Sequence, residues 1–359
     1  MHLHLLIPAL LRPPLYVDHA RYGPAANTLP RLEALELLLA RGRRRAHEDA
    51  DATAWLCGVH GIARQADWPV APIALLADGG QPGNGFWLRA DPVHLRLQGD
   101  HLLLADASLL ALSREEASAL ADSLNQHFAG DGFSLHALQS DRWYAQLAAV
   151  PGITTTPLAH AAGQSVDENL PRGADAPAWH ARLNEVQMLL HDHPVNAARE
   201  AHGAMPVNSL WFWGGGVLPV EQEPSVENPR PFNRVWAGDA FARGLAAACG
   251  ATAHALPESA TALLAAAPQQ GVGLVVLDAL AAPLAYGDIG AWEARLLELE
   301  AAWFTPLVAA LRAQRIGMLT LHGFGATGAG EPGGFALETA RQDLARFWRR
   351  PKPLSKQLV

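Results

Sequence analysis

Apolar positions along this chain follow two patterns: short continuous runs typical of buried strands, and longer stretches with the spacing of amphipathic helices. The short runs predict strands at 3–7, 210–213, 272–277 and 316–321. The spaced pattern predicts helices at 29–44, 178–191, 240–249, 259–267, 292–312 and 337–347. Because strands and helices alternate, we expect an α/β fold with a mainly parallel sheet flanked by helices.

A different pattern begins after the turn Asp78–Gly83, where glycine and proline interrupt the chain. Ser113 and Glu116 have the spacing of a capping box, which predicts a helix from there to about residue 128. Around this helix we expect strands at 86–97, 102–106, 133–138 and 143–147. The sequence therefore predicts a core formed by residues 1–80 and 195–359, with an α+β cap domain inserted at 81–194.

The composition argues against several classes of function. The chain has 359 residues, of which 50% are hydrophobic, and a net charge of -8 at pH 7. This charge argues against a nucleic-acid partner, and the basic run within Arg41–Arg45 is interpreted as the solvated end of a helix. No apolar run approaches the ~20 residues of a membrane span, and the first residues lack a basic leader. We therefore expect no membrane association and a cytoplasmic location.

The stretch from His193 to Gly216 contains residue types suited to the recognition of an anion. Arg199 offers a planar fork of donors, Asn196 and Asn208 offer amides, and the glycines let backbone N–H groups approach an oxyanion. Polar residues of the predicted cap suit the same role. The candidate ligand-binding residues are Arg89, Asp91, His94, Arg142, His193, Asn196, Arg199, Asn208, Gly214, Gly215 and Gly216.

Several of these candidates also have a purely structural interpretation. Arg89 and Asp91 alternate on one face of a strand and would form a surface ion pair. His193 precedes a proline and would cap a turn. Arg199 would stabilise the end of the preceding helix. Both interpretations stay open at the level of the sequence.

The motifs occur in the order found in a known family. His193-Pro194-Val195-Asn196 with Arg199 resembles the HPVN-x-x-R of archaeal-type cofactor-independent phosphoglycerate mutases, members of the alkaline phosphatase superfamily. The other similar stretches are Leu29–Leu35, Phe86–Asp91, Leu112–Ala117, Arg142–Trp143 and Leu183–Glu185. The resemblance implies an alkaline-phosphatase-like core and phosphoryl transfer by a serine at two divalent metal ions.

Three further stretches resemble a narrower group. Asp67–Pro72, Arg89–Leu95 and Asn184–His191 are similar to signatures of the proteobacterial regulatory proteins of RpfE type. That resemblance implies a regulatory role and specifies no reaction.

The residues that phosphoryl transfer requires are replaced. The first predicted strand ends in Ile7-Pro8 where the mutases have Asp-Gly, and the segment 30–83 contains no serine. The ligands of the family's D-E-x-G-H motif, aligned on Gly287-Asp288, fall on small or apolar residues, and at the last metal strand only His322 remains. One imidazole without carboxylates does not balance the charge of two cations. We therefore predict neither a metal cofactor nor catalytic residues.

The sequence thus favours a pseudoenzyme, a non-catalytic regulatory or sensor protein derived from a phosphoglycerate mutase. We expect it to bind a phosphorylated or other anionic small molecule in a pocket between cap and core. The residues expected to form this pocket are Arg89, Arg142, Arg199, Asn196 and the turn Gly214–Gly216.

Two alternatives stay open. One is a divergent phosphoglycerate mutase or phosphatase with an altered metal site, which would use Asp49, Thr53 and His322. The other is a protein-interaction module without a ligand, whose contacts with a partner protein would come from Trp87, Trp143 or Trp213.

Overall fold

The computed structural model describes residues 1–11, 31–98, 101–219, 230–267, 270–326 and 332–354. Its internal contacts divide the chain into two compact units. Unit 1 comprises Met1–Gly61 and Glu223–Val359, and unit 2 comprises Ile62–Gln222. None of the helices in the described residues is long and apolar enough to cross a membrane.

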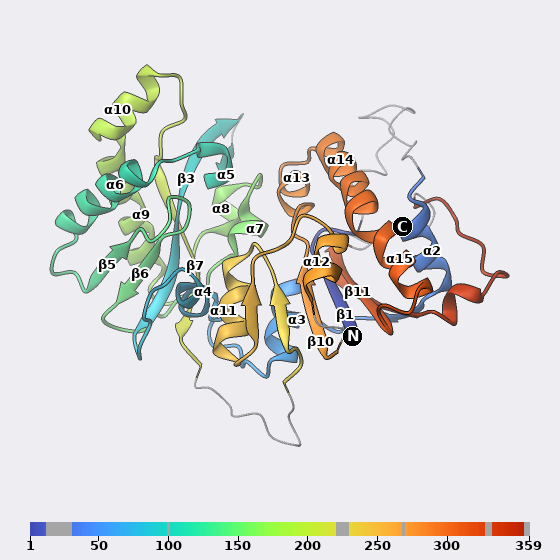
Figure 1. Cartoon of the computed structure of the whole chain (residues 1–359). Coiled ribbons are helices and arrows are strands. Elements are labelled where there is room, and N and C mark those ends of the chain that lie inside the picture. The colour runs from blue at the N-terminus through green and yellow to red at the C-terminus, as the bar shows by residue number, and fades with distance from the viewer. Residues whose placement is uncertain (12–30, 99–100, 220–229, 268–269, 327–331, 355–359) are drawn as a thin grey trace. The chain divides into compact units, whose positions relative to one another are not determined.

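Unit 1 contains a seven-stranded sheet in the order β2-β12-β11-β1-β10-β8-β9 (Figure 1). Its strands are β1 (His2–Ile7), β2 (Arg43–Ala46), β8 (Arg234–Trp236), β9 (Thr252–His254), β10 (Val272–Val276), β11 (Met318–Ala326) and β12 (Pro332–Ala340). β1 pairs in parallel with β10 and β11, whereas β12 runs antiparallel to β11 and β2. This mostly parallel sheet flanked by helices confirms the predicted fold class, with 3–7 and 272–277 adjacent in one sheet.

Alternation along β1 gives the two faces of this sheet different surroundings. Leu3, Leu5 and Ile7 belong to a large apolar core, whereas His2 and His4 lie on the opposite face. Residues of several helices contribute to the apolar core, among them α2 (Glu33–Arg41), α12 (Ala260–Ala266), α14 (Ile289–Leu299) and α15 (Thr305–Arg312). A π-helical turn, η3 (Glu300–Phe304), joins α14 to α15, so the predicted helix 292–312 is present but irregular. The remaining helices of unit 1 are α3 (Ala52–Val59), α11 (Ala240–Ala248), α13 (Ala281–Ala285) and η4 (Asp343–Ala345).

Two predicted helices in unit 1 are wrong in part. Residues 337–340 belong to strand β12, and only the short helix η4 follows them. Every second residue here is buried, namely Phe335, Leu337 and Thr339, and the residues between them are partly exposed. This alternation is typical of a strand that is covered on one face. The basic run is not a helix end either: α2 stops at Arg41 and the next residues form strand β2, which pairs with β12. Leu29 and Pro30 lie outside the described residues.

Unit 2 contains an antiparallel sheet of five strands (Figure 1). Its strands are β3 (Phe86–Gln98), β4 (His101–Ala105), β5 (Phe133–His136), β6 (Tyr144–Leu147) and β7 (Ser209–Val217). Its helices are α4 (Val70–Ala77), α5 (Ala107–Leu110), α6 (Arg114–His127), α7 (Leu158–Ala161), α8 (Val166–Asn169), α9 (Ala176–His191) and α10 (Pro194–Ala201). Both hydrogen bonds of the predicted capping box between Ser113 and Glu116 are present at the start of α6.

Strand 210–213 was expected in the parallel sheet of the core but lies in the sheet of unit 2. It forms part of β7, which pairs antiparallel with β3 along most of its length. Leu210 and Phe212 are buried in the core of unit 2, and α4 packs against both β3 and β7. Apolar content alone cannot assign such a strand to one of two sheets. The expected cap, 81–194, leaves out α4 and β7, whereas unit 2 includes them.

Candidate functional site

A network of arginines and carboxylates lies within unit 2, formed by Asp78, Arg89, Asp91, Asp141, Arg142, Tyr144 and Trp213. Strand β3 places Arg89 and Asp91 on one face because they are two residues apart. Nε and Nη2 of Arg89 donate to Oδ1 of Asp91 at 3.1 and 2.6 Å. The other carboxylate oxygen accepts a hydrogen bond from Nε1 of Trp213 at 2.7 Å. The predicted ion pair is therefore present, but both of its side chains are buried rather than at the surface.

Aromatic rings from both neighbouring strands surround the Arg89 guanidinium. The register pairs Arg89 with Tyr144 of β6 on one side and with Trp213 of β7 on the other. The guanidinium carbon lies 5.2 Å from the centre of the Tyr144 ring and 5.4 Å from that of Trp213. Cation–π attraction on a desolvated arginine is worth about 2 kcal/mol, so Arg89 is fixed by charge and by packing.

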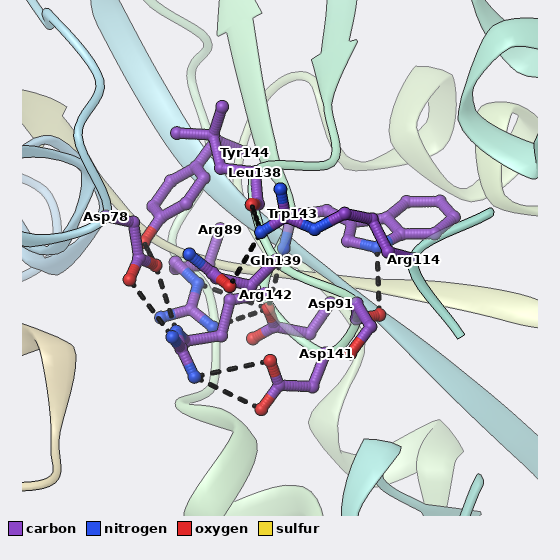
Figure 2. Close-up of polar contacts among 11 residues, drawn as sticks. Asp78, Arg89, Asp91, Arg114, Leu138, Gln139, Asp141, Arg142, Trp143 and Tyr144 are labelled. Carbon is purple, nitrogen blue, oxygen red and sulfur yellow. Dashed lines mark hydrogen bonds and ion pairs between the residues drawn. The ribbon is translucent and has the colours of Figure 1, made fainter. Parts of the chain in front are cut away.

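Arg142 forms the more accessible half of the network, and Figure 2 shows its polar contacts. Its Nε and Nη2 donate to the two oxygens of Asp78 at 2.9 and 3.0 Å, which is the bidentate geometry of a strong pair. The Tyr144 hydroxyl donates to the same carboxylate at 2.7 Å. Nη1 of Arg142 points instead to Asp141, whose two oxygens lie at 3.2 and 3.1 Å. The Arg142 side chain is 26% exposed and that of Asp141 is 49% exposed.

The electrostatics of the network follow from these contacts. Burial alone would raise the pKa of Asp78, but the hydrogen bonds from Arg142 and Tyr144 lower it. The hydrogen bond with Asp78 raises the pKa of Arg142, and burial raises the pKa of Tyr144. Two guanidinium groups face three carboxylates, so an anion could bind only by replacing a carboxylate. Asp141 is the exposed carboxylate of the three.

Arg199 and Asn196 lie in a different part of unit 2, on α10. Nη1 of Arg199 donates to Glu116 at 2.9 Å, while its other nitrogens donate to the carbonyls of Met205 and Leu110. The Asn196 amide donates to the carbonyls of Leu190 and Val207, both at 2.7 Å. Both side chains are buried, and both connect α10 to the segments around it.

His94, Asn208 and the glycines of β7 also have structural contacts. Nδ1 of His94 lies 2.9 Å from the carbonyl of Pro206, and the Asn208 amide pairs with both backbone groups of Leu95. Gly214–Gly216 continue strand β7 instead of forming the expected turn. A Cβ at Gly214 would lie 2.9 Å from Val70, so this glycine allows α4 to pack closely on β7.

His193, for which the sequence left open a turn cap or a ligand contact, caps the start of helix α10. Its Nδ1 accepts a hydrogen bond from the backbone N–H of Val195 at the start of α10, at 3.2 Å. The neutral ring therefore carries its proton on Nε2, which lies 2.9 Å from the Ser123 hydroxyl. In this tautomer His193 donates to Ser123, so it cannot accept that hydroxyl's proton as a general base would.

A chain of imidazoles lies on the histidine face of the unit 1 sheet. Nε2 of His322 lies 2.9 Å from Nδ1 of His4, and its Nδ1 lies 3.1 Å from Nε2 of His47. The ring of Trp55 is 4.1 Å from that of His322, centre to centre. Burial lowers the pKa of His322 to about 2 and that of His4 to about 3. His322 is thus a neutral, buried group with both nitrogens in hydrogen bonds.

His322, the one residue expected to remain of a two-metal site, has imidazoles and not carboxylates as the partners of its ring nitrogens. His322 occupies the place that resembles the last metal strand, but its neighbours are imidazoles and aromatic rings. Across the residues that the structure describes, there is no group of three or more His, Cys, Asp or Glu arranged to hold a metal ion. Asp49 precedes α3, whose N-cap is Asp51, and Thr53 lies in the first turn of that helix.

Sequence reasoning missed the partners of His322. The signal was the shared strand face of His2 and His4, since β11 places Thr320 and His322 beside them. His47 follows β2, whose first two residues were expected to end a helix, so the approach of His47 to His322 could not be predicted.

Comparison with known proteins supports a distant relationship to the mutases. No protein-family model matches the chain. The chain is 31% identical over 140 residues to a 2,3-bisphosphoglycerate-independent phosphoglycerate mutase of Methanosarcina mazei, which covers 38% of this chain and 35% of that enzyme. It is 30% identical over 117 residues to the corresponding enzyme of Methanothrix thermoacetophila, covering 33% and 29%. The matches span about a third of these relatives' length.

One solved structure agrees at the level of the fold, with a TM-score above 0.5. The PH0037 protein from Pyrococcus horikoshii aligns with a TM-score of 0.54 at 14% identity, over 94% of this chain and 86% of that one. The cofactor-independent phosphoglycerate mutase of Thermoplasma acidophilum aligns with a TM-score of 0.46 at 17% identity, over 99% and 95%. Over about a third of its length, the chain therefore shows distant homology to 2,3-bisphosphoglycerate-independent phosphoglycerate mutases.

Proposed function

We propose that the chain is a non-catalytic regulatory or sensor protein of the RpfE-type group that its sequence resembles. In this proposal the mutase ancestry supplies the fold, while the phosphoryl-transfer machinery is lost. The ligand that regulates it is a phosphorylated or other anionic small molecule.

The proposed loss of catalysis rests on the hydrogen bonds of His322. A histidine that binds a metal needs a free nitrogen lone pair, usually with a carboxylate or carbonyl on its other nitrogen. Here His4 and His47 occupy both nitrogens, and Trp55 covers the ring. The end of β1, which would supply a carboxylate in the mutases, is Ile7-Pro8.

The test is an activity assay of the purified chain. 3-Phosphoglycerate and a chromogenic phosphate ester are incubated with Mn²⁺, Mg²⁺ or Zn²⁺ added in turn. We expect no turnover above the rate without protein. Turnover that a chelator abolishes, and that His322→Ala reduces, would establish the divergent mutase or phosphatase instead. Asp131→Asn, an exposed change in unit 2, is the matched control.

Arg142 supports the anionic ligand. Asp78 anchors its guanidinium through two nitrogens, so the third is presented in a fixed direction toward the exposed Asp141. A phosphate or carboxylate that displaces Asp141 gains this preorganised donor without disturbing the buried pair. Asp141 would then act as an internal competitor of the ligand.

The ligand is sought by thermal unfolding with a panel of phosphorylated metabolites and nucleotides. A ligand that binds only the folded state adds about 2.7 kcal/mol at 100 times its Kd. Asp141→Asn should enlarge the shift because the competing carboxylate is gone, and Arg142→Lys should reduce it because the fork is lost. A panel without any shift, or a shift that both variants leave unchanged, contradicts the ligand site but not the absence of catalysis.

A further inference from the structure

An exposed patch of arginines and aromatic rings lies on unit 1. It is formed by β2, with Arg43, Arg44 and Arg45, and by the segment Arg346–Lys352. Hydrogen bonds hold the second segment to the residues that directly precede β2: Arg346 donates to the carbonyl of Arg41 at 3.0 Å, and Arg349 donates to that of Gly42 at 3.3 Å. Segments distant in sequence thus form one surface, which we call the basic–aromatic patch.

The aromatic part of this patch stands out by its exposure among the phenylalanines and tryptophans of the chain. Of the 10 phenylalanines and 11 tryptophans, all of which lie in described residues, only Phe347 and Trp348 are exposed. Their exposed fractions are 77% and 66%. The two rings meet edge to face, 5.3 Å apart. By contrast, Trp87 and Trp143, expected as partner contacts in the interaction-module alternative, are buried.

The charge of the patch is opposite to that of the chain. Its two segments carry seven Arg and Lys and no acidic residue, while the whole chain has a net charge of -8. Asp343, adjacent to the patch, is buried. It already forms ion pairs with two arginines, Arg346 at 2.6 Å and Arg43 at 3.6 Å. Glu338 lies 3.9 Å from Arg45. Arg44 stacks over Phe335, whereas Arg350 is exposed.

We propose that the basic–aromatic patch binds an acidic, extended segment of another protein. Arginine forks suit carboxylates, and exposed tryptophan and arginine are the residue types that most often anchor protein interfaces. β2 is the end strand of the seven-stranded sheet, so an extended segment can lie alongside it.

The charge distribution favours this partner over other polyanions. A bilayer or a long nucleic acid extends beyond the patch and meets the repulsion of a chain with eight excess negative charges. A short acidic segment contacts only the patch. Phe347 and Trp348 would bury apolar area against such a segment, which favours its binding.

The test is a selection from displayed random twelve-residue peptides on the intact chain. We expect the enriched peptides to be rich in Asp and Glu with at least one large apolar residue. Their affinity, measured by fluorescence anisotropy of the labelled peptides, should fall at least tenfold in Trp348→Ala and in Arg350→Ala. Met188→Ala, which truncates an equally exposed side chain of unit 2, is the matched control and should change nothing.

Each other outcome overturns the proposal. If the enriched peptides have no excess of acidic residues, the patch does not recognise its partner by charge. If Trp348→Ala leaves the affinity of the peptides unchanged, the peptides do not bind at the patch. An oligothymidylate or phosphatidylserine vesicles that bind in a Trp348-dependent manner, more tightly than the peptides, assign the patch to nucleic acid or membrane. Circular dichroism of each variant verifies that the fold is retained.

Discussion

At the scale of single residues, arginines suited to a ligand are bound by groups of the protein itself. Arg89 pairs with Asp91, and Arg199 pairs with Glu116 and two carbonyls. The sequence could show that these residue types were present and that Arg89 and Asp91 share a strand face. It could not show their burial, because burial depends on β6 and β7 lying on both sides of β3. Of the three arginines, Arg142 retains a contact at the surface.

Removing Arg89 should destabilise the protein strongly. Arg89→Met leaves the carboxylate of Asp91 buried without its cation, and such a loss costs about 3–5 kcal/mol. Urea unfolding at pH 7 measures it. The double variant Arg89→Met/Asp91→Leu should regain most of the loss because it removes the uncompensated charge. Arg295→Met, which breaks an exposed pair with Glu298, is the control and should cost less than about 0.5 kcal/mol. A loss below about 1 kcal/mol for the single variant contradicts the assignment.

The imidazole chain should make the protein sensitive to acid. Burial lowers the pKa of His322 to about 2 and that of His4 to about 3, against 6.5 in the unfolded chain. The unfolded state therefore binds more protons below pH 6.5, so the stability present above that pH is lost as the pH falls. At pH 5 the loss is about 2 kcal/mol for each of these two histidines. Two carboxylates act on the imidazole chain: Glu338 raises the pKa of His2, and Asp49 raises that of His47. Neither cancels the effect of burial, which lowers both pKa values.

Urea unfolding at pH 7 and pH 5 measures this sensitivity. Burial also lowers the pKa of His60, to about 4, and its Nδ1 is buried without a hydrogen-bond partner among the described residues. His60→Phe should therefore reduce the difference between the two pH values by about 1 kcal/mol or more. His191→Gln changes an exposed histidine and should leave the difference as it is. Equal stability of the parent chain at both pH values would contradict a neutral imidazole chain.

At the scale of elements, local signals predicted α6 correctly and failed at β12. The capping box is a property of four adjacent residues, so the start of α6 at Arg114 follows from the sequence alone. Residues 335–340 are Phe-Ala-Leu-Glu-Thr-Ala, and their alanine, leucine and glutamate favour a helix locally. Pairing with β11 and β2 satisfies the backbone of this segment as a strand. Such long-range pairing is not visible in a local pattern.

Removal of the α6 cap tests how much this element depends on its first turn. Ser113→Ala removes the acceptor for the Glu116 backbone N–H and should cost about 1 kcal/mol in thermal or urea unfolding. Glu116→Ala should cost more, because the same carboxylate also accepts from the buried Arg199. Ser118→Ala lies on the exposed face of the helix and is the matched control. If the two capping variants cost the same, the pair with Arg199 contributes nothing to stability.

At the scale of the whole molecule, the sequence predicted the architecture, while the boundaries 81–194 of the inserted module stay a prediction. The order of strands and helices was sufficient for a mainly parallel sheet with an inserted module, because alternation restricts the connections that are available. The ends of the module depend on α4 and β7, two apolar elements that suit either sheet equally well. Their contacts with β3 assign them to unit 2.

Expression of fragments decides between the two boundaries. Ile62–Gln222 includes α4, β7 and a complete core of its own, so it should fold alone, with cooperative urea unfolding and dispersed amide resonances. The fragment 81–194 lacks β7, and the backbone groups of β3 that pair with β7 would then be unsatisfied at a sheet edge. It also exposes the apolar side chains that contact Leu210 and Phe212, so we expect it to be unfolded or to aggregate. A folded 81–194 fragment, as stable as the longer one, would show that the boundaries drawn from the sequence are the physical ones and that β7 contributes little to the sheet.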